Sequence, residues 1–213
     1  MKTDDLVNLL ATGTAPVERD VPARRFGIAL SIAAAGALCL MMIGFGVRPD
    51  LASVMQTARF WEKLAFPLCV AIGALTAAAR VARPGAVVGI GWLEMAIPVV
   101  LVWVGGLFVV VSAEPPDRVL LVLGQTWRTC PLNILLLSIP GFVAIFWAIK
   151  GLAPTRLGIA GAVAGLLASS IATIAYCLHC PEMSPAFWGI WYVLGMALPA
   201  ALGAWLGPRL LRW

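Results

Sequence analysis

Charged side chains are scarce in this chain of 213 residues, of which Asp, Glu, Lys and Arg make up only 12%. A soluble domain has about 25%. Hydrophobic residues make up 62%, and a soluble core of this size cannot hide that much apolar surface from water. The scarcity of charge therefore excludes a soluble globular protein and a disordered chain. It predicts an all-α integral membrane protein.

Histidine is scarcer still, and the motifs of several enzyme classes are missing. The sequence has no Walker phosphate-binding loop, no dinucleotide-binding glycine fingerprint and no HExxH zinc motif. Its single histidine, His179, belongs to a cysteine-rich run and is not free for a Ser/His/Asp triad. The net charge is +5, but the arginines flank apolar runs, where membrane proteins need them. We expect neither an enzyme nor a nucleic-acid-binding protein.

Six apolar runs approach the length of about 20 residues that a helix needs to cross a bilayer. They cover residues 26–46, 63–79, 86–112, 132–149, 157–178 and 186–206. The sequence predicts a bundle of six transmembrane helices over residues 26–213, preceded by a short tail over residues 1–25. Close helix contact is expected at three pairs of small residues, Gly85/Gly89, Gly161/Gly165 and Gly203/Gly207.

The positions of Lys and Arg predict the orientation, because cytoplasmic flanks carry an excess of both. Ten of the fifteen lie in the two terminal segments and in the loops after the second and fourth spans. Both termini are therefore expected in the cytoplasm, with the protein in a bacterial inner membrane. Tryptophans gather at membrane interfaces. We expect Trp61, Trp127, Trp188 and Trp191 at the outer interface, and Trp147, Trp205 and Trp213 at the inner one.

The residues best suited to chemistry lie together on the predicted outer side. The run CLHCPEM at positions 177–183 follows the fifth span, and Cys130 precedes the fourth. In a periplasm this face is oxidising. Cys39 and Cys69 lie inside apolar runs, and we expect each to be an inert, buried small hydrophobe. The outer cluster is therefore the candidate functional site.

The sequence leaves several functions of this cluster open. A disulfide between Cys130 and either Cys177 or Cys180 would tie the outer loop to the fifth span. Together with His179, the same thiols are soft ligands suited to copper, zinc or cadmium. Cys177 and Cys180 also have the spacing of a thiol–disulfide exchange pair, as in a quinone-linked membrane oxidoreductase. The simplest reading is a structural disulfide beside a solvated His179.

Glu94 is the one carboxylate inside a predicted span. An acid at that depth is a candidate functional residue, and a metal transporter would place it on the path of the ion. We instead favour an ion pair between Glu94 and Arg80 or Arg83 at the cytoplasmic interface, because the other spans contain no acid.

The N-terminal tail begins with the pattern of a short amphipathic helix. Thr3 is a good N-cap, and Asp4 suits the positive end of the helix dipole. Leu6, Leu9 and Leu10 share one face at i, i+3, i+4 spacing. So short a helix is not stable alone in water. These five residues are therefore expected to fold on a partner protein.

Taken together, these features resemble the NrsF-like membrane anti-sigma factors. The resemblance rests on the opening MKTDxL, the six spans, Cys130 ahead of the fourth span and HCPE at positions 179–182, and it covers the whole chain. It implies a protein that holds an extracytoplasmic-function sigma factor at the inner membrane and releases it under oxidative or heavy-metal stress. It also implies that the tail takes part in sigma binding.

The resemblance further implies that the two cysteines of the family match Cys130 and Cys180. Cys177 is a third thiol that this two-cysteine pattern does not include. It allows disulfide exchange within the cluster or a metal site with three thiolates. We expect the sensor to use Cys130, Cys180, Cys177 and His179, and the membrane lipid to be the other partner of the chain.

Overall fold

The computed structural model describes residues 3–12 and 20–212, and this part of the chain is helical without strands. Residues 1–2 and 13–19 of the predicted tail, and Trp213 at the predicted inner interface, lie outside the described residues. The helices are α1 (Thr3–Ala11), α2 (Val21–Gly44), α3 (Leu51–Val54), α4 (Ala58–Val81), α5 (Gly91–Ser112), α6 (Pro115–Leu123), α7 (Cys130–Leu137), α8 (Ile139–Lys150), α9 (Leu157–Tyr176), α10 (Pro185–Phe187), the π-helix η1 (Trp188–Tyr192) and α11 (Val193–Leu210).

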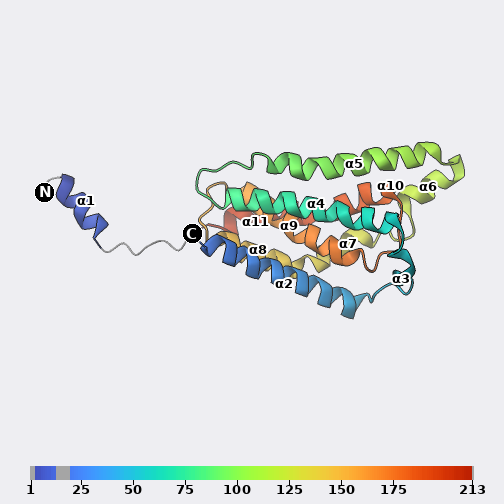
Figure 1. Cartoon of the computed structure of the whole chain (residues 1–213), viewed down its shortest axis with the longest axis horizontal. Coiled ribbons are helices and arrows are strands. Elements are labelled where there is room, and N and C mark those ends of the chain that lie inside the picture. The colour runs from blue at the N-terminus through green and yellow to red at the C-terminus, as the bar shows by residue number, and fades with distance from the viewer. Residues whose placement is uncertain (1–2, 13–19, 213) are drawn as a thin grey trace.

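Five helical segments are long and apolar enough to cross a membrane: α2, α4, α5, α9 and the run from α10 to α11. The pair α7 and α8 makes a sixth if it counts as one span. A membrane bundle of five to six spans therefore agrees with the predicted fold class. In Figure 1 the spans lie side by side, with α3, α6 and α10 at one end and the start of α2 at the other.

The fourth span is broken, although the sequence predicted one continuous helix over residues 132–149. The axes of α7 and α8 meet at 46° at Ser138. Pro140 lies in the first turn of α8; it has no N–H to donate to the carbonyl of Leu136, and its ring crowds that oxygen. The Ser138 hydroxyl donates to the Leu135 carbonyl at 2.7 Å, which also bends helices. The span consequently divides into two halves, of which α7 lies towards the end of the bundle that carries α3 and α6 (Figure 1). This end is called outer below, after the orientation predicted from the sequence.

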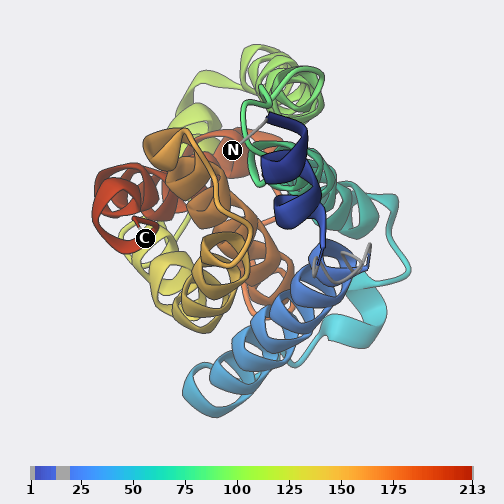
Figure 2. The ribbon, with the colours of Figure 1, turned by 90° about the vertical axis from the view of Figure 1, so that its left-hand side faces the viewer.

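Helix α9 lies at the centre of the bundle and packs on α11, α4, α8 and α2 (Figure 2). The glycine pairs account for its contact with α11. A Cβ on Gly161 would meet the Gly203 carbonyl, and one on Gly207 would meet the Leu157 carbonyl. This confirms close packing at two of the three predicted pairs. Gly85 and Gly89 instead lie in the α4–α5 connection with positive φ angles of 75° and 60°, so that pair makes no helix contact.

The other span boundaries differ from the predictions at both ends of the bundle. Helix α4 begins at Ala58 and includes Lys63 in its second turn, whereas α5 begins only at Gly91. Trp188 is buried, and its Nε1 donates to the Glu182 carbonyl at 3.1 Å. Its side chain therefore packs inside the bundle, and its place at the outer interface stays a prediction. Because α9 ends near η1 and the start of α7, the outer half of the bundle brings the cysteine-bearing segments together.

Candidate functional site

Three cysteines meet in the outer half of the bundle, as the sequence predicted. Cys130 begins α7, Cys177 follows the last residue of α9, and Cys180 lies in the segment between α9 and α10. All three are free thiols, 0% exposed, and belong to one packed cluster with Tyr176 and Tyr192. Cys39 and Cys69 are exposed on the bundle surface, so their expected burial is wrong: each side chain points away from the neighbouring helices. The two groups of cysteines therefore differ sharply in environment.

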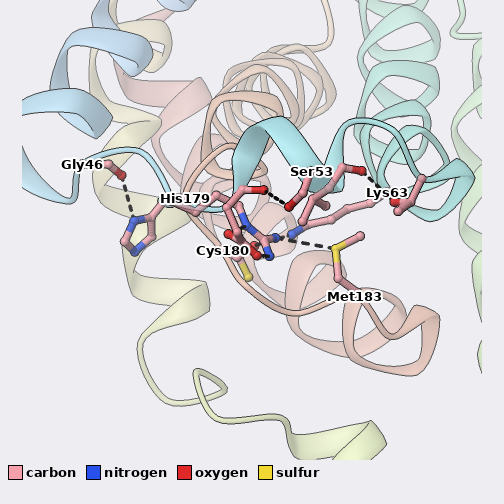
Figure 3. A network of polar contacts seen from close by, with 10 residues as sticks. Gly46, Ser53, Lys63, His179, Cys180 and Met183 are labelled. Carbon is pink, nitrogen blue, oxygen red and sulfur yellow. Dashed lines mark hydrogen bonds and ion pairs between the residues drawn. The ribbon is translucent and has the colours of Figure 1, made fainter.

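The carbonyl oxygen of Cys180 accepts hydrogen bonds from two cationic side chains (Figure 3). Lys63 Nζ donates to it at 2.6 Å, and Arg48 Nη1 donates at 3.2 Å. Arg48 also reaches Met183 Sδ at 3.6 Å. The backbone of α4 approaches the cluster too, because Cys177 Sγ lies 3.8 Å from the Lys63 carbonyl oxygen. The Cys180 backbone is thus fixed from both the α2–α3 connection and α4.

Lys63 is unusual because it is fully buried and, within the described part of the chain, forms no ion pair with a carboxylate. Its ammonium donates to a neutral carbonyl and lies 5.8 Å from the centre of the Tyr192 ring. Burial of a charge without a counter-ion is costly. The outer cluster therefore contains a positive charge that the neutral thiols do not balance.

The surroundings shift the pKa values of three groups in and beside the cluster. Arg48 pairs with Asp50, with Nε 2.7 Å from Oδ1. This hydrogen-bonded pairing raises the pKa of Arg48 and lowers the pKa of Asp50. Burial raises the pKa of the Cys177 thiol to about 12, although the Lys63 charge opposes this. Cys177 is consequently protonated at neutral pH in this arrangement.

His179 turns away from the thiols towards the outer end of α2. Its Nδ1 lies 3.0 Å from the Gly46 carbonyl oxygen, and its ring packs between Phe45 and Tyr176. Among the described residues, no group of three His, Cys, Asp or Glu side chains is arranged to hold a metal ion. His179 therefore acts here as a link to α2, and this geometry gives the predicted copper, zinc or cadmium site no support.

Glu182 connects the cysteine segment to the long outer loop. Its Oε1 accepts hydrogen bonds from the backbone N–H groups of Gln125 and Thr126, at 2.7 and 3.2 Å. Gly124 makes this approach possible, since a Cβ there would lie 2.6 Å from the Glu182 carboxylate carbon. The loop that leads into Cys130 is thus held to the segment that contains Cys180.

The predicted ion pair of Glu94 is wrong. Within the described residues Glu94 pairs with neither Arg80 nor Arg83, and Arg80 Nη1 donates to the Val88 carbonyl at 3.3 Å. Gly89 and Arg80 lie in direct contact, so Arg80 is held at the α4–α5 connection and not beside the acid. Glu94 Oε2 is a buried oxygen without a hydrogen-bond partner. Glu94 lies in the first turn of α5 and is distant in sequence from the three cysteines of the cluster.

The tail forms the predicted helix. Helix α1 covers Thr3–Ala11 and has no buried residue. Leu6 is 42% exposed, and Leu9 and Leu10 are each 67% exposed. Their apolar face is therefore free for a partner.

The sequence predictions missed Lys63, Arg48 and Glu182 as parts of the site. From the sequence, Lys63 and Arg48 were interpreted only as basic residues of the predicted outer loops. The available signal was a lysine near the start of an apolar helix, since Lys63 lies five residues after Ala58, where α4 begins. Glu182 belongs to the HCPE run, but nothing in the sequence shows that its carboxylate reaches the loop before Cys130.

Comparison with known proteins agrees with this picture. The profile of a family described as "negative regulator of sigma F" matches residues 10–213. A probable anti-sigma-F factor NrsF of Azospira oryzae is 45% identical over the full length of both chains. An anti-sigma-F factor NrsF of Caulobacter vibrioides is 33% identical, again over the full length of both. No solved structure matches.

Proposed function

This chain belongs to the family of negative regulators of sigma F, and we propose on that basis that it holds a sigma-F-type factor of the extracytoplasmic-function class at the bacterial inner membrane. Its family consists of anti-sigma factors, which are regulators and not enzymes. Membership of this family therefore argues against the two alternative functions, a quinone-linked oxidoreductase and a metal transporter. Both termini face the cytoplasm in this proposal, where the tail meets its partner.

The tail binds the sigma factor through the apolar face of α1. Leu6, Leu9 and Leu10 are exposed on one side of a helix that has no buried residue. Such a face is typical of a helix that lies in a groove of its partner. Thr3 is the first residue of α1 and not the N-cap expected from the sequence, and Asp4 in the first turn suits the positive end of the helix dipole.

The observation that carries the sensing part of the proposal is the meeting of three buried thiols from two segments, the start of α7 and the connection between α9 and α10. Two thiols and one molecule of a hydroperoxide give a disulfide, water and an alcohol, or two waters when the oxidant is hydrogen peroxide. Cys130 and Cys180 form this disulfide, and Cys177 exchanges with it. Because the thiols are buried, and because burial raises the pKa of Cys177, the resting cluster reacts slowly and the switch stays off without stress.

The route from the cluster to the tail is α2. The Arg48 backbone N–H donates to the Leu178 carbonyl at 3.1 Å, His179 contacts the Gly46 carbonyl, and Arg48 contacts the Cys180 carbonyl. Closing a disulfide at Cys180 displaces this segment and alters all three contacts. A difference of about 1.4 kcal/mol in tail affinity between the two states changes sigma binding tenfold.

Heavy metals act through the same thiols in this proposal. A thiophilic cation that binds Cys130 and Cys180 draws the same two segments together as a disulfide does. The position of His179 beside Gly46 favours oxidation as the primary signal, because a metal that used this imidazole would first have to break its contact with α2.

The test is the capture of the sigma factor from native membranes through a tag on the C-terminus. A sigma-F-type factor is expected to remain bound at rest and to be lost after treatment with hydrogen peroxide. The variant Cys130→Ser/Cys180→Ser should retain it under both conditions. The matched control is Cys39→Ser/Cys69→Ser, which removes two exposed thiols and should respond as the wild type does.

Two outcomes would contradict the proposal. Release by peroxide that survives the loss of Cys130, Cys177 and Cys180 together would remove the sensor assignment. A sigma factor that is still captured after Leu9→Asp/Leu10→Asp would remove the tail as its binding segment.

A further inference from the structure

A second polar site lies at the other end of the bundle, away from the thiols. A cavity of about 210 Å³ is lined by Val21, Arg24, Arg25 and Ile28 of α2 and by Trp147 of α8. Its lining residues lie in the first turns of α2 and in the last turn of α8. Two arginines and one tryptophan therefore share a pocket at the end of two membrane-spanning segments.

Arg25 is held in a defined position in this pocket. Its Nη1 donates to the Trp147 carbonyl at 3.3 Å, and its guanidinium lies 4.9 Å from the centre of the Trp147 ring. The guanidinium also lies against Gly151, where any Cβ would overlap it. The side chain is thus fixed by a carbonyl and an aromatic face of α8 and by the glycine that follows this helix. Its remaining N–H groups are left to donate elsewhere.

Among the described residues, no carboxylate pairs with the two arginines of the pocket. Within residues 3–12 and 20–212, neither Arg24 nor Arg25 forms an ion pair, and no acid lines the cavity. Arg24 is exposed beside the half-buried Arg25. Guanidinium groups donate paired hydrogen bonds that match the oxygens of a phosphate. The missing partner of this pocket is accordingly an anion with phosphate geometry.

The position of the pocket identifies the source of that anion. The apolar residues Val21 and Ile28 of the lining continue onto the lipid-facing surface of α2, and tryptophan is typical of the headgroup level. Basic pockets between transmembrane helices bind the headgroups of anionic lipids. We propose that Arg24, Arg25 and Trp147 form a binding site for the phosphate of an anionic phospholipid.

A lipid bound here fixes the start of α2 at the membrane surface. Arg24 and Arg25 are the last two residues of the predicted tail and lie in the first turns of α2. The lipid site therefore sets the point from which α1 reaches into the cytoplasm. This inference does not depend on the sensor: it stands even if the thiols respond to another signal.

The experiment measures lipids retained by the purified full-length protein. The protein is reconstituted into nanodiscs of phosphatidylcholine with 20% phosphatidylglycerol (an amount chosen as about the anionic content of a bacterial membrane). It is then extracted, and native mass spectrometry counts bound phosphatidylglycerol. Arg24→Gln/Arg25→Gln is expected to lower the bound fraction at least tenfold.

The matched control is Arg209→Gln. Arg209 lies 4.7 Å from the centre of the Trp205 ring and donates to the Trp205 carbonyl at 3.3 Å, so it repeats the stack and the hydrogen bond of Arg25 inside a single helix. Its loss should leave phosphatidylglycerol binding unchanged. Thermal unfolding of each variant identifies loss of fold. If Arg24→Gln/Arg25→Gln does not fold, Arg24→Gln alone, which changes an exposed side chain, is expected to lower the bound fraction at least threefold.

Three results would overturn the proposal. Equal retention of phosphatidylglycerol by the wild type and by folded Arg24→Gln would show that the pocket does not bind the lipid. Equal retention of phosphatidylcholine and phosphatidylglycerol would show that it does not select an anion. Displacement of the lipid by millimolar glycerol 3-phosphate would assign the pocket to a soluble phosphate.

Discussion

The Nζ atom of Lys63 lies 2.6 Å from the carbonyl oxygen of Cys180, and both residues are buried. Arg48 Nη1 donates to the same oxygen at 3.2 Å. A carbonyl oxygen has two lone pairs, and here each accepts from a cation. Either cation alone keeps this buried oxygen hydrogen-bonded, so the two side chains should replace one another in part.

We expect the effects of Lys63→Met and Arg48→Met on stability to be strongly non-additive. Each single change leaves the Cys180 oxygen with one donor and should cost about 1 kcal/mol. The double change leaves a buried acceptor without a partner, which costs about 1–3 kcal/mol beyond the sum. Thermal unfolding of the four proteins of this cycle in detergent measures the coupling. A control is Arg59→Met, which breaks an exposed pair with Glu62 and should change stability by less than about 1 kcal/mol. Additive losses would refute the shared role of the two cations.

Gly124→Ala should loosen the long outer loop. Gly124 has φ 57° and ψ −162°, a region open essentially to glycine alone, and its Cβ would overlap the Glu182 carboxylate. The substitution is expected to cost more than about 2 kcal/mol and to speed cleavage of residues 113–129 by an added protease. Gly85→Ala is the control, because Gly85 also has a positive φ but nothing lies within 4 Å of its Cβ position. Equal losses at the two glycines would mean that Glu182 plays no part.

Gly161→Ala should separate α9 from α11. The added Cβ would overlap the Gly203 carbonyl and approach the Gly207 Cα at 2.9 Å, so two helix backbones must move apart. We expect a loss of about 1–3 kcal/mol. Gly105→Ala in α5 meets nothing within 4 Å and should be neutral or slightly stabilising, because alanine favours helix by about 1 kcal/mol. Unfolding in a denaturing detergent compares the two variants, and an unaffected Gly161→Ala would argue against this interface.

Acid should weaken the contact between Arg48 and the cysteine segment. The pairing with Arg48 lowers the pKa of Asp50 in the folded protein. The stabilisation is complete above the pKa of an ordinary aspartate, about 3.9, and is lost as the pH falls through the lowered value. The variant Asp50→Asn should therefore lose less stability than the wild type between about pH 5 and pH 2. Parallel acid curves for the two proteins would exclude this contribution.

The sequence predicted the membrane bundle, the helix in the tail and the meeting of the cysteines, because each depends on a local pattern. Apolar runs of sufficient length specify spans. The two thiol-bearing segments end on one side of the membrane because an even number of crossings separates them. Close packing at Gly161 followed from small residues that recur on one helix face.

The remaining features depend on contacts between distant segments, which no local pattern encodes. Lys63 reaches Cys180 across 117 positions of the chain, and Glu182 reaches Gln125 across 57. The break at Ser138 was missed because a proline inside a membrane helix can be accommodated by its neighbours, as Pro67 is within α4. The ion pair expected for Glu94 failed for the same reason, since the fold holds Arg80 at Val88.

Because of the break between α7 and α8, the fourth span is not a rigid helix. A displacement of Cys130 at the outer end of α7 bends the span at Ser138. It is therefore not transmitted to α8, which carries Trp147. Helix α2 is continuous over 24 residues and about 36 Å long, with a smooth buried stripe that includes Ala29, Ala33 and Ala37. Two segments run between the thiol cluster and the pocket at Arg25: α2, and the pair α7 and α8. Only α2 is unbroken, so only α2 can transmit a displacement of a few ångströms from one membrane surface to the other.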